Sequence, residues 1–241
     1  MRRISFDKSW WDTRDYRNLL RKVPVDRLHD RRCLLLSAAC ARLLSDRITL
    51  KESHAAIEAA EQASELIASN GAAAETVLRA TWDHELADDS PAHVRHFHDH
   101  LKVAYDRRQV LGCSSADTAA MWTAWPGGSW FGFVHVADRV AVILSRGNRE
   151  SVREQKAAIC NLVRDVFEPP TEQDSPNVQV RPPEAVLLAE SMYSSLDFSA
   201  IPELGVILSR AGCTDTAVLS HCVAARPHIR GCWVIDQLLG K

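Results

Sequence analysis

Apolar residues recur at helical spacing in one segment after another, and this pattern constrains the fold of the chain more than any other feature. Between Arg31 and Leu44, for example, Cys33, Leu34, Ala38 and Leu44 recur at near-helical spacing on one broad face. Such spacing predicts an amphipathic helix rather than a strand. The same periodicity returns between residues 150 and 167.

Residues typical of helix starts and helix ends predict further helices along the chain. Thr49 and Glu52 have the spacing of a capping box, and Asn70-Gly71 is a typical helix end. The predicted helices cover about 49–67, 72–86, 91–105, 116–125 and 150–167, with three or four shorter ones in 184–241. Short helices joined by short loops indicate an all-α fold.

The segment 129–145 is ambiguous. Its aromatic and β-branched residues have strand character, so a small β-hairpin is the alternative. A buried helix is favoured because the flanking segments are helical.

The domain organisation follows from composition. Residues 1–22 form a basic and aromatic arm, and residues 23–241 are expected to form a single helical domain. Five prolines in 168–183 predict a loop within that domain.

Bulk properties indicate a cytoplasmic protein. The net charge of −2 argues against a general polyanion binder. We find no apolar run long enough to cross a membrane, and charged residues interrupt the N-terminus before a signal peptide could form. Seven scattered cysteines, an odd number, do not suggest a secreted disulfide framework.

The densest group of metal-ligand residue types lies near the C-terminus. It comprises Cys213, His221, Cys222, His228 and Cys232. Thiolate and imidazole are the ligands that zinc prefers, so a structural zinc ion is one interpretation. The alternative is that the cysteines are small buried apolar residues and the histidines have hydrogen-bond partners.

Two other groups are candidate sites. Basic and aromatic residues of the arm could track nucleic-acid phosphates and stack on bases: Arg2, Arg3, Trp10, Trp11, Arg14 and Arg17. The alternative is an arm packed on the domain. The stretch His96–His100 holds three histidines and an aspartate and would suit a metal-dependent hydrolase, although a solvated polar helix face is the favoured interpretation. Asp165, Glu168 and Glu172 are expected to form a polar rim.

The C-terminal third resembles a known pattern. It carries Ala211-Gly212-Cys213, Leu219-Ser220-His221-Cys222, and a closing run from Pro227-His228 through Arg230-Gly231-Cys232-Trp233 to Asp236. This pattern is similar to that of an uncharacterised family of helical proteins in planctomycete bacteria. The resemblance implies an all-α fold and a bacterial cytoplasmic setting, and it implies no catalytic residues.

Motifs for nucleophilic catalysis or nucleotide binding do not occur. The chain holds no G-x-S-x-G elbow, phosphate-binding P-loop or dinucleotide fingerprint. The first hypothesis is therefore a non-enzymatic interaction or regulatory module with a protein partner. The alternatives are a nucleic-acid-associated accessory protein that uses the arm, and a metal-dependent hydrolase that uses His96–His100.

Overall fold

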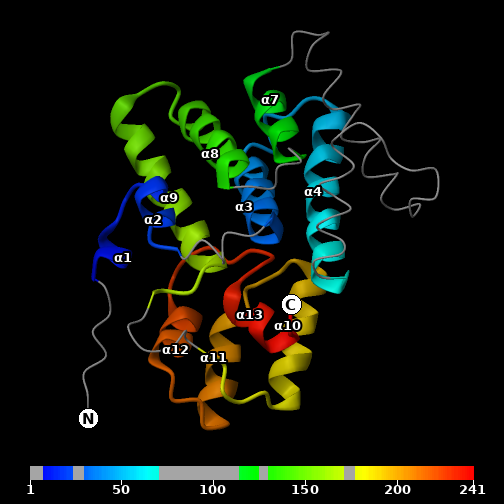
Figure 1. Cartoon of the computed structure of the whole chain (residues 1–241), viewed down its shortest axis with the longest axis vertical. Coiled ribbons are helices and arrows are strands. Elements are labelled where there is room, and N and C mark those ends of the chain that lie inside the picture. The colour runs from blue at the N-terminus through cyan, green and yellow to red at the C-terminus, as the bar shows by residue number, and fades with distance from the viewer. Residues whose placement is uncertain (1–7, 24–29, 71–113, 125–129, 171–176) are drawn as a thin grey trace, which may run out of the picture. The chain divides into compact units, whose positions relative to one another are not determined.

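The computed structural model describes residues 8–23, 30–70, 114–124, 130–170 and 177–241 (Figure 1). Within these ranges the regular structure is helical and no strand occurs, which confirms the predicted all-α fold. None of the described helices is both long enough and apolar enough to cross a membrane. The helices predicted over 72–86 and 91–105 lie outside the described residues.

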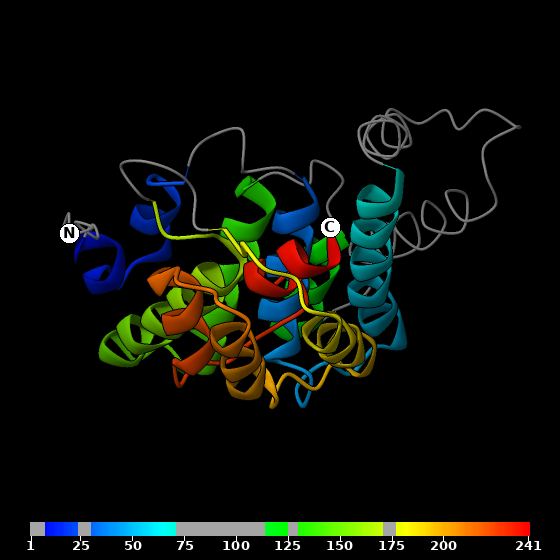
Figure 2. The ribbon, with the colours of Figure 1, turned by 90° about the horizontal axis from the view of Figure 1, so that it is seen from below.

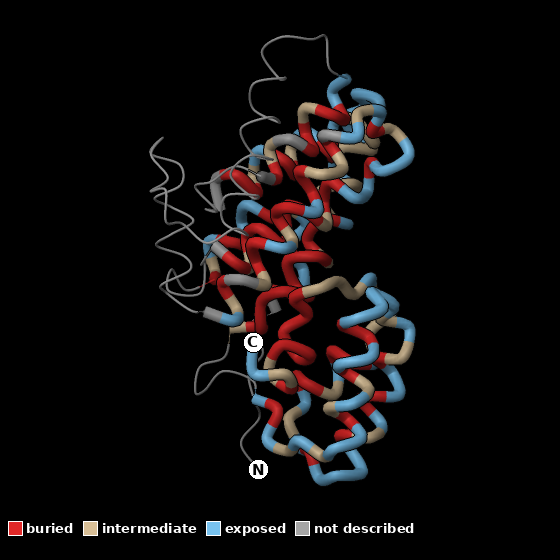
Figure 3. Tube along the Cα trace, turned by 90° about the vertical axis from the view of Figure 1, so that its right-hand side faces the viewer, coloured by how far each residue is buried: buried red, intermediate tan, exposed pale blue. Residues whose placement is uncertain are grey.

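The chain divides into two compact units. One comprises residues 1–23 together with 160–241, and the other comprises 24–159. Buried and exposed residues alternate along the helices of each unit, as expected when amphipathic helices surround a core (Figure 3).

The 24–159 unit is built on α3 (Asp30–Arg42), which packs against α4 (Lys51–Asn70) and α8 (Trp130–Leu144). Figure 2 shows α3 and α4 side by side. The short helices α7 (Ser115–Met121) and η2 (Trp122–Ala124) pack on the same helices.

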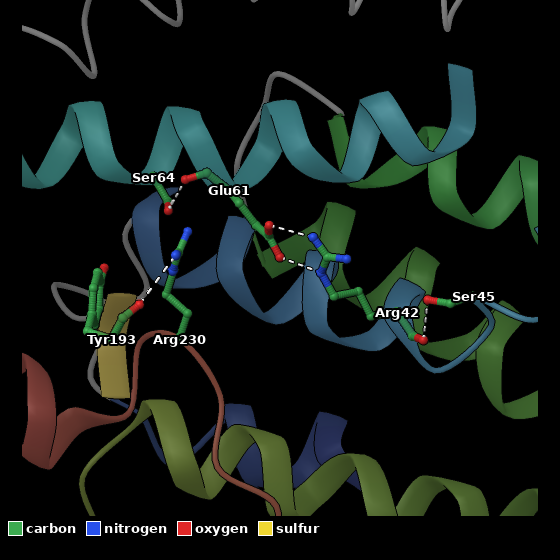
Figure 4. A network of polar contacts seen from close by, with 6 residues as sticks. All are labelled: Arg42, Ser45, Glu61, Ser64, Tyr193 and Arg230. Carbon is green, nitrogen blue, oxygen red and sulfur yellow. Dashed lines mark hydrogen bonds and ion pairs between the residues drawn. The ribbon is translucent and has the colours of Figure 1, made fainter. Parts of the chain in front are cut away.

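Two acidic side chains make the principal polar contacts in this unit. Glu61 accepts two hydrogen bonds from the Arg42 guanidinium, at 2.6 and 2.7 Å (Figure 4). Asp117 of α7 is buried and accepts the backbone N–H groups of Thr49 and Leu50, both at 3.0 Å. It thereby satisfies two backbone donors just before the start of α4, and it also accepts from the Thr49 hydroxyl at 2.9 Å.

The ambiguous segment is helical. In α8 the buried residues follow a three- and four-residue spacing: Phe133, Val136, Ala137, Val140 and Ala141. This spacing places them in one stripe, whereas a hairpin would have placed alternate residues on opposite faces. The preference for a helix over a hairpin is confirmed, because periodicity outweighs the strand propensity of the individual residues.

The other unit combines α1 (Lys8–Asp12), α2 (Tyr16–Leu20), the end of α9 (Arg149–Val166) and four C-terminal helices. These are α10 (Pro183–Ser195), α11 (Ile201–Arg210), α12 (Thr216–Val223) and α13 (Trp233–Leu239). Helix α10 packs on α11 and α13, and α11 packs closely on α12.

Local signals set the ends of these helices. Asp215 caps α12 by accepting from the N–H groups of Ala217 and Val218, at 2.8 and 3.3 Å. Gly212, at φ 95°, follows α11 in a left-handed conformation that favours glycine. Between α11 and α12, Gly205 allows the close approach, because a Cβ there would lie 2.7 Å from the Cβ of Cys222.

Candidate metal centre

Three segments of the 1–23/160–241 unit bring four ligand-type side chains together. Asp165 comes from the last turn of α9, His221 from α12, and His228 and Cys232 from the loop between α12 and α13. One ligand atom from each residue lies within 4.8 Å of those of the other three. We refer to these four residues as the Asp165 cluster.

The carboxylate of Asp165 is the centre of the cluster. Its Oδ1 lies 2.6 Å from Nδ1 of His228 and 3.1 Å from Nε2 of His221. Its Oδ2 accepts the backbone N–H of Ile229 at 2.8 Å. The side chain is fully buried, which opposes ionisation, but the hydrogen bonds and charges of the two imidazoles prevail and lower the pKa of Asp165 to about 2. A buried carboxylate is therefore present at neutral pH.

His221 is held on both of its ring nitrogens. The indole N–H of Trp233 donates to Nδ1 at 2.9 Å, and Nε2 lies 3.1 Å both from Asp165 and from the sulfur of Cys232. Its side chain is 2% exposed. Burial lowers the pKa of His221 although Asp165 favours its charged form, so the ring is neutral at pH 7.

Cys232 is also buried, and burial raises the pKa of its thiol well above the ordinary value. The thiol consequently keeps its proton unless a cation enters the cluster. Cys232 and Asp165 contact the same nitrogen of His221, whereas a catalytic triad requires the nucleophile and the acid on opposite nitrogens. His221 thus does not link Cys232 and Asp165 in the geometry of a Cys-His-Asp triad.

The donor set suits zinc chemically. One thiolate, two imidazoles and one carboxylate are all ligands that zinc accepts in tetrahedral sites. Zn²⁺ with the charges of Asp165 and Cys232 would leave the buried cluster neutral, which avoids an uncompensated internal charge.

The spacing of the cluster is that of hydrogen bonds. Zinc–ligand bonds of about 2.0–2.3 Å put neighbouring ligands of a tetrahedron about 3.3–3.8 Å apart. The contacts of Asp165 to His228 and to His221, at 2.6 and 3.1 Å, are shorter than this. Zinc would therefore replace the shared protons and widen the cluster by several tenths of an ångström.

The residue next to Asp165 holds the N-terminal segment. The guanidinium of Arg164 is buried and donates to the backbone carbonyls of Trp10, Trp11 and Thr13, at 2.8, 3.0 and 2.6 Å. The guanidinium of Arg226 lies 5.2 Å from the centre of the Trp11 ring. These contacts fix α1 to the end of α9.

The five C-terminal residues singled out in the sequence do not all meet. His221, His228 and Cys232 belong to the Asp165 cluster, whereas Cys213 and Cys222 are buried elsewhere in the core of the same unit. Cys222 lies in the α11–α12 contact opposite Gly205.

The expectation that Asp165 and Glu168 form a polar rim is wrong, because both side chains are buried. The last turn of α9 is covered on all sides, since residues 162–169 are all buried. The nearest signal in the sequence is that Asp165 interrupts the apolar run from Leu162 to Phe167.

The arm residues have different positions. Trp10 is 1% exposed and belongs to the core, while Trp11 is 38% exposed beneath Arg226. Arg14 and Arg17 are exposed. Arg2 and Arg3, like the stretch His96–His100, lie outside the described residues.

Comparison with known proteins identifies no relative: the chain matches no protein-family model, no curated protein and no solved structure.

Proposed function

We propose that this chain is a non-enzymatic interaction or regulatory module whose C-terminal part is stabilised by a structural zinc ion at the Asp165 cluster. The observation that carries the proposal is the convergence of four ligand-type side chains in a buried position. Asp165, His221 and Cys232 are at most 2% exposed. A catalytic zinc keeps one coordination position open to substrate, whereas a structural zinc is enclosed by four protein ligands.

The position of the cluster supports a structural role. It joins the end of α9 to α12 and to the loop that precedes α13. That loop has no regular structure of its own, so its conformation depends on the contacts of His228 and Ile229 with Asp165. A metal ion bound there would crosslink three segments, and its binding energy would add to the stability of the fold.

The partner-binding part of the proposal is supported by apolar side chains at the surface. Leu187, Val206 and Val223, on three successive helices of the C-terminal part, are 65%, 47% and 69% exposed. Apolar side chains supply much of the buried core of protein interfaces. Their replacement by lysine should abolish co-purification of any specific partner from native cells while leaving the melting temperature unchanged. A partner retained by such a variant would not bind through these residues.

The zinc is tested by elemental analysis of protein purified without chelator. We expect about one equivalent in the wild type and none in a Cys232→Ser, His228→Ala double variant, with a lower melting temperature in the variant. Cys213→Ser is the matched control, because Cys213 is a buried cysteine of the same unit outside the cluster. Zinc in the double variant, or no zinc in the wild type, would contradict the proposal.

A further inference from the structure

Trp233 determines which nitrogen of His221 carries the proton. Its indole N–H is buried and lies 2.9 Å from Nδ1 of His221. An indole nitrogen can only donate a hydrogen bond, so Nδ1 must act as the acceptor. Because a neutral imidazole has one N–H, the proton of His221 is on Nε2, the nitrogen that faces Asp165 and Cys232.

Metal binding needs the opposite tautomer. The cluster-facing nitrogen Nε2 would have to present its lone pair to the ion, and the proton would then be on Nδ1. Histidines that bind metal usually donate their other N–H to a carboxylate or a carbonyl. Here that second nitrogen faces a donor, the indole of Trp233, so two N–H groups would oppose each other.

We propose that Trp233 is a positioning residue that opposes metal entry: it holds His221 in the tautomer that hydrogen-bonds to Asp165, and a bound divalent cation breaks the Trp233–His221 hydrogen bond. This inference rests on the proposed metal site. The metal affinity of the site is then reduced, since the ion must break the Trp233–His221 hydrogen bond in order to bind.

Binding of a divalent cation would move the protons of the cluster in a defined way. The proton of His221 moves from Nε2 to Nδ1 within the ring, and His228 presents a ring nitrogen without a proton to the ion. Cys232 releases its thiol proton to solvent and becomes a thiolate, while Asp165 is already a carboxylate. Binding therefore releases the thiol proton, and no electron is transferred.

The test compares the affinities of wild type and Trp233→Phe for Zn²⁺ and for Co²⁺, whose visible absorption reports tetrahedral ligation. Phenylalanine retains an aromatic ring for packing and removes the N–H. Because the net contribution of one buried hydrogen bond is about 0.5–1.5 kcal/mol, the variant should bind the ion roughly 3- to 10-fold more tightly.

Trp10→Phe is the matched control. Trp10 is equally buried in the same unit, and its indole nitrogen has no hydrogen-bond partner. This variant loses the same ring volume but leaves the four residues of the cluster and Trp233 unchanged, so its metal affinity should equal that of the wild type.

The outcomes separate this inference from the proposed function. Tighter binding by Trp233→Phe alone supports the role of Trp233. Equal or weaker binding by that variant overturns it but leaves the metal site in place. If no variant binds either ion, the proposed zinc function fails, and this inference fails with it. Nitrogen NMR of His221 gives an independent check in the wild-type protein, because the proton should move from Nε2 to Nδ1 when zinc is added.

Discussion

Replacing Asp165 by asparagine tests whether the buried carboxylate organises the C-terminal part of the protein. Asparagine has nearly the same shape but presents an NH₂ group on one side. Asp165 faces donors on both oxygens, from His228 and His221 at Oδ1 and from Ile229 at Oδ2. The amide of the variant must therefore oppose at least one donor.

The magnitude follows from these contacts. A hydrogen bond to a charged group contributes about 1.5–3 kcal/mol, and the Asp165 carboxylate has three such contacts. His228 can recover part of this loss by changing tautomer, because its ring can then accept from the amide. We expect Asp165→Asn to lower the free energy of unfolding by about 3 kcal/mol at pH 7.

The effect should depend on pH in a defined direction. The pKa of Asp165 is about 2 in the folded protein against an ordinary 3.8, so the unfolded state takes up its proton first as the pH falls. The stabilisation is complete above about pH 5 and is lost towards pH 2, a contribution of about 2 kcal/mol. This contribution of Asp165 to the difference between wild type and Asp165→Asn therefore shrinks below pH 4.

His221 also makes the folded protein less stable as the pH falls, and its effect begins at a higher pH than that of Asp165. Its folded pKa is lowered from 6.5, so the unfolded state binds a proton that the folded state refuses as the pH falls below that value. This loss is larger in Asp165→Asn, which lacks the carboxylate that favours charged His221. It therefore widens the difference from wild type, while the loss of the Asp165 contribution narrows it.

The assay is urea unfolding followed by circular dichroism from pH 7 to pH 3, with a chelator present so that no metal contributes. Asp46→Asn is the control, since Asp46 is an exposed aspartate outside the cluster and should leave the stability near the wild-type value. An Asp165→Asn protein within about 1 kcal/mol of wild type at pH 7 would refute the reasoning.

Three further predictions concern the surroundings of the cluster. Arg164→Met should release the N-terminal segment, which limited proteolysis would detect as faster cleavage within residues 8–23, because three backbone carbonyls lose their donor. Gly205→Ala should lower the free energy of unfolding by about 1–3 kcal/mol in thermal or urea denaturation, since its Cβ would lie 2.7 Å from that of Cys222. If the exposed arm residues bind nucleic acid, Arg14→Glu with Arg17→Glu should abolish salt-dependent binding in a filter assay without changing the melting temperature.

The helices could be predicted from the sequence because their signals are local. The stripe from Phe133 to Ala141 is buried at the spacing that the amino-acid pattern indicates, and this settles the one segment where strand propensity competed. Likewise, a single left-handed glycine, Gly212, follows α11. Each of these features depends on residues within two turns of one another.

The cluster could be predicted only in part because it depends on long-range packing. His221, His228 and Cys232 are close in sequence and were identifiable by residue type. Asp165 comes from a helix more than fifty residues away, and a charged residue near a helix end is usually exposed. The position of Trp10 could not be predicted for the same reason, since its side chain is buried and its backbone carbonyl accepts from Arg164, far along the chain.

Two buried charged residues at the end of α9 explain why the 1–23/160–241 unit is assembled from both ends of the described chain. Adjacent residues on a helix point about 100° apart, so Arg164 and Asp165 contact different segments. Arg164 donates to carbonyls of the N-terminal segment, and Asp165 accepts from the loop before α13. Each charge would be costly to bury alone, and each is compensated only when its own segment is in place. The stability of residues 1–23 and that of 160–241 should therefore be coupled through one turn of helix, although the two segments are separated by the whole 24–159 unit in the sequence.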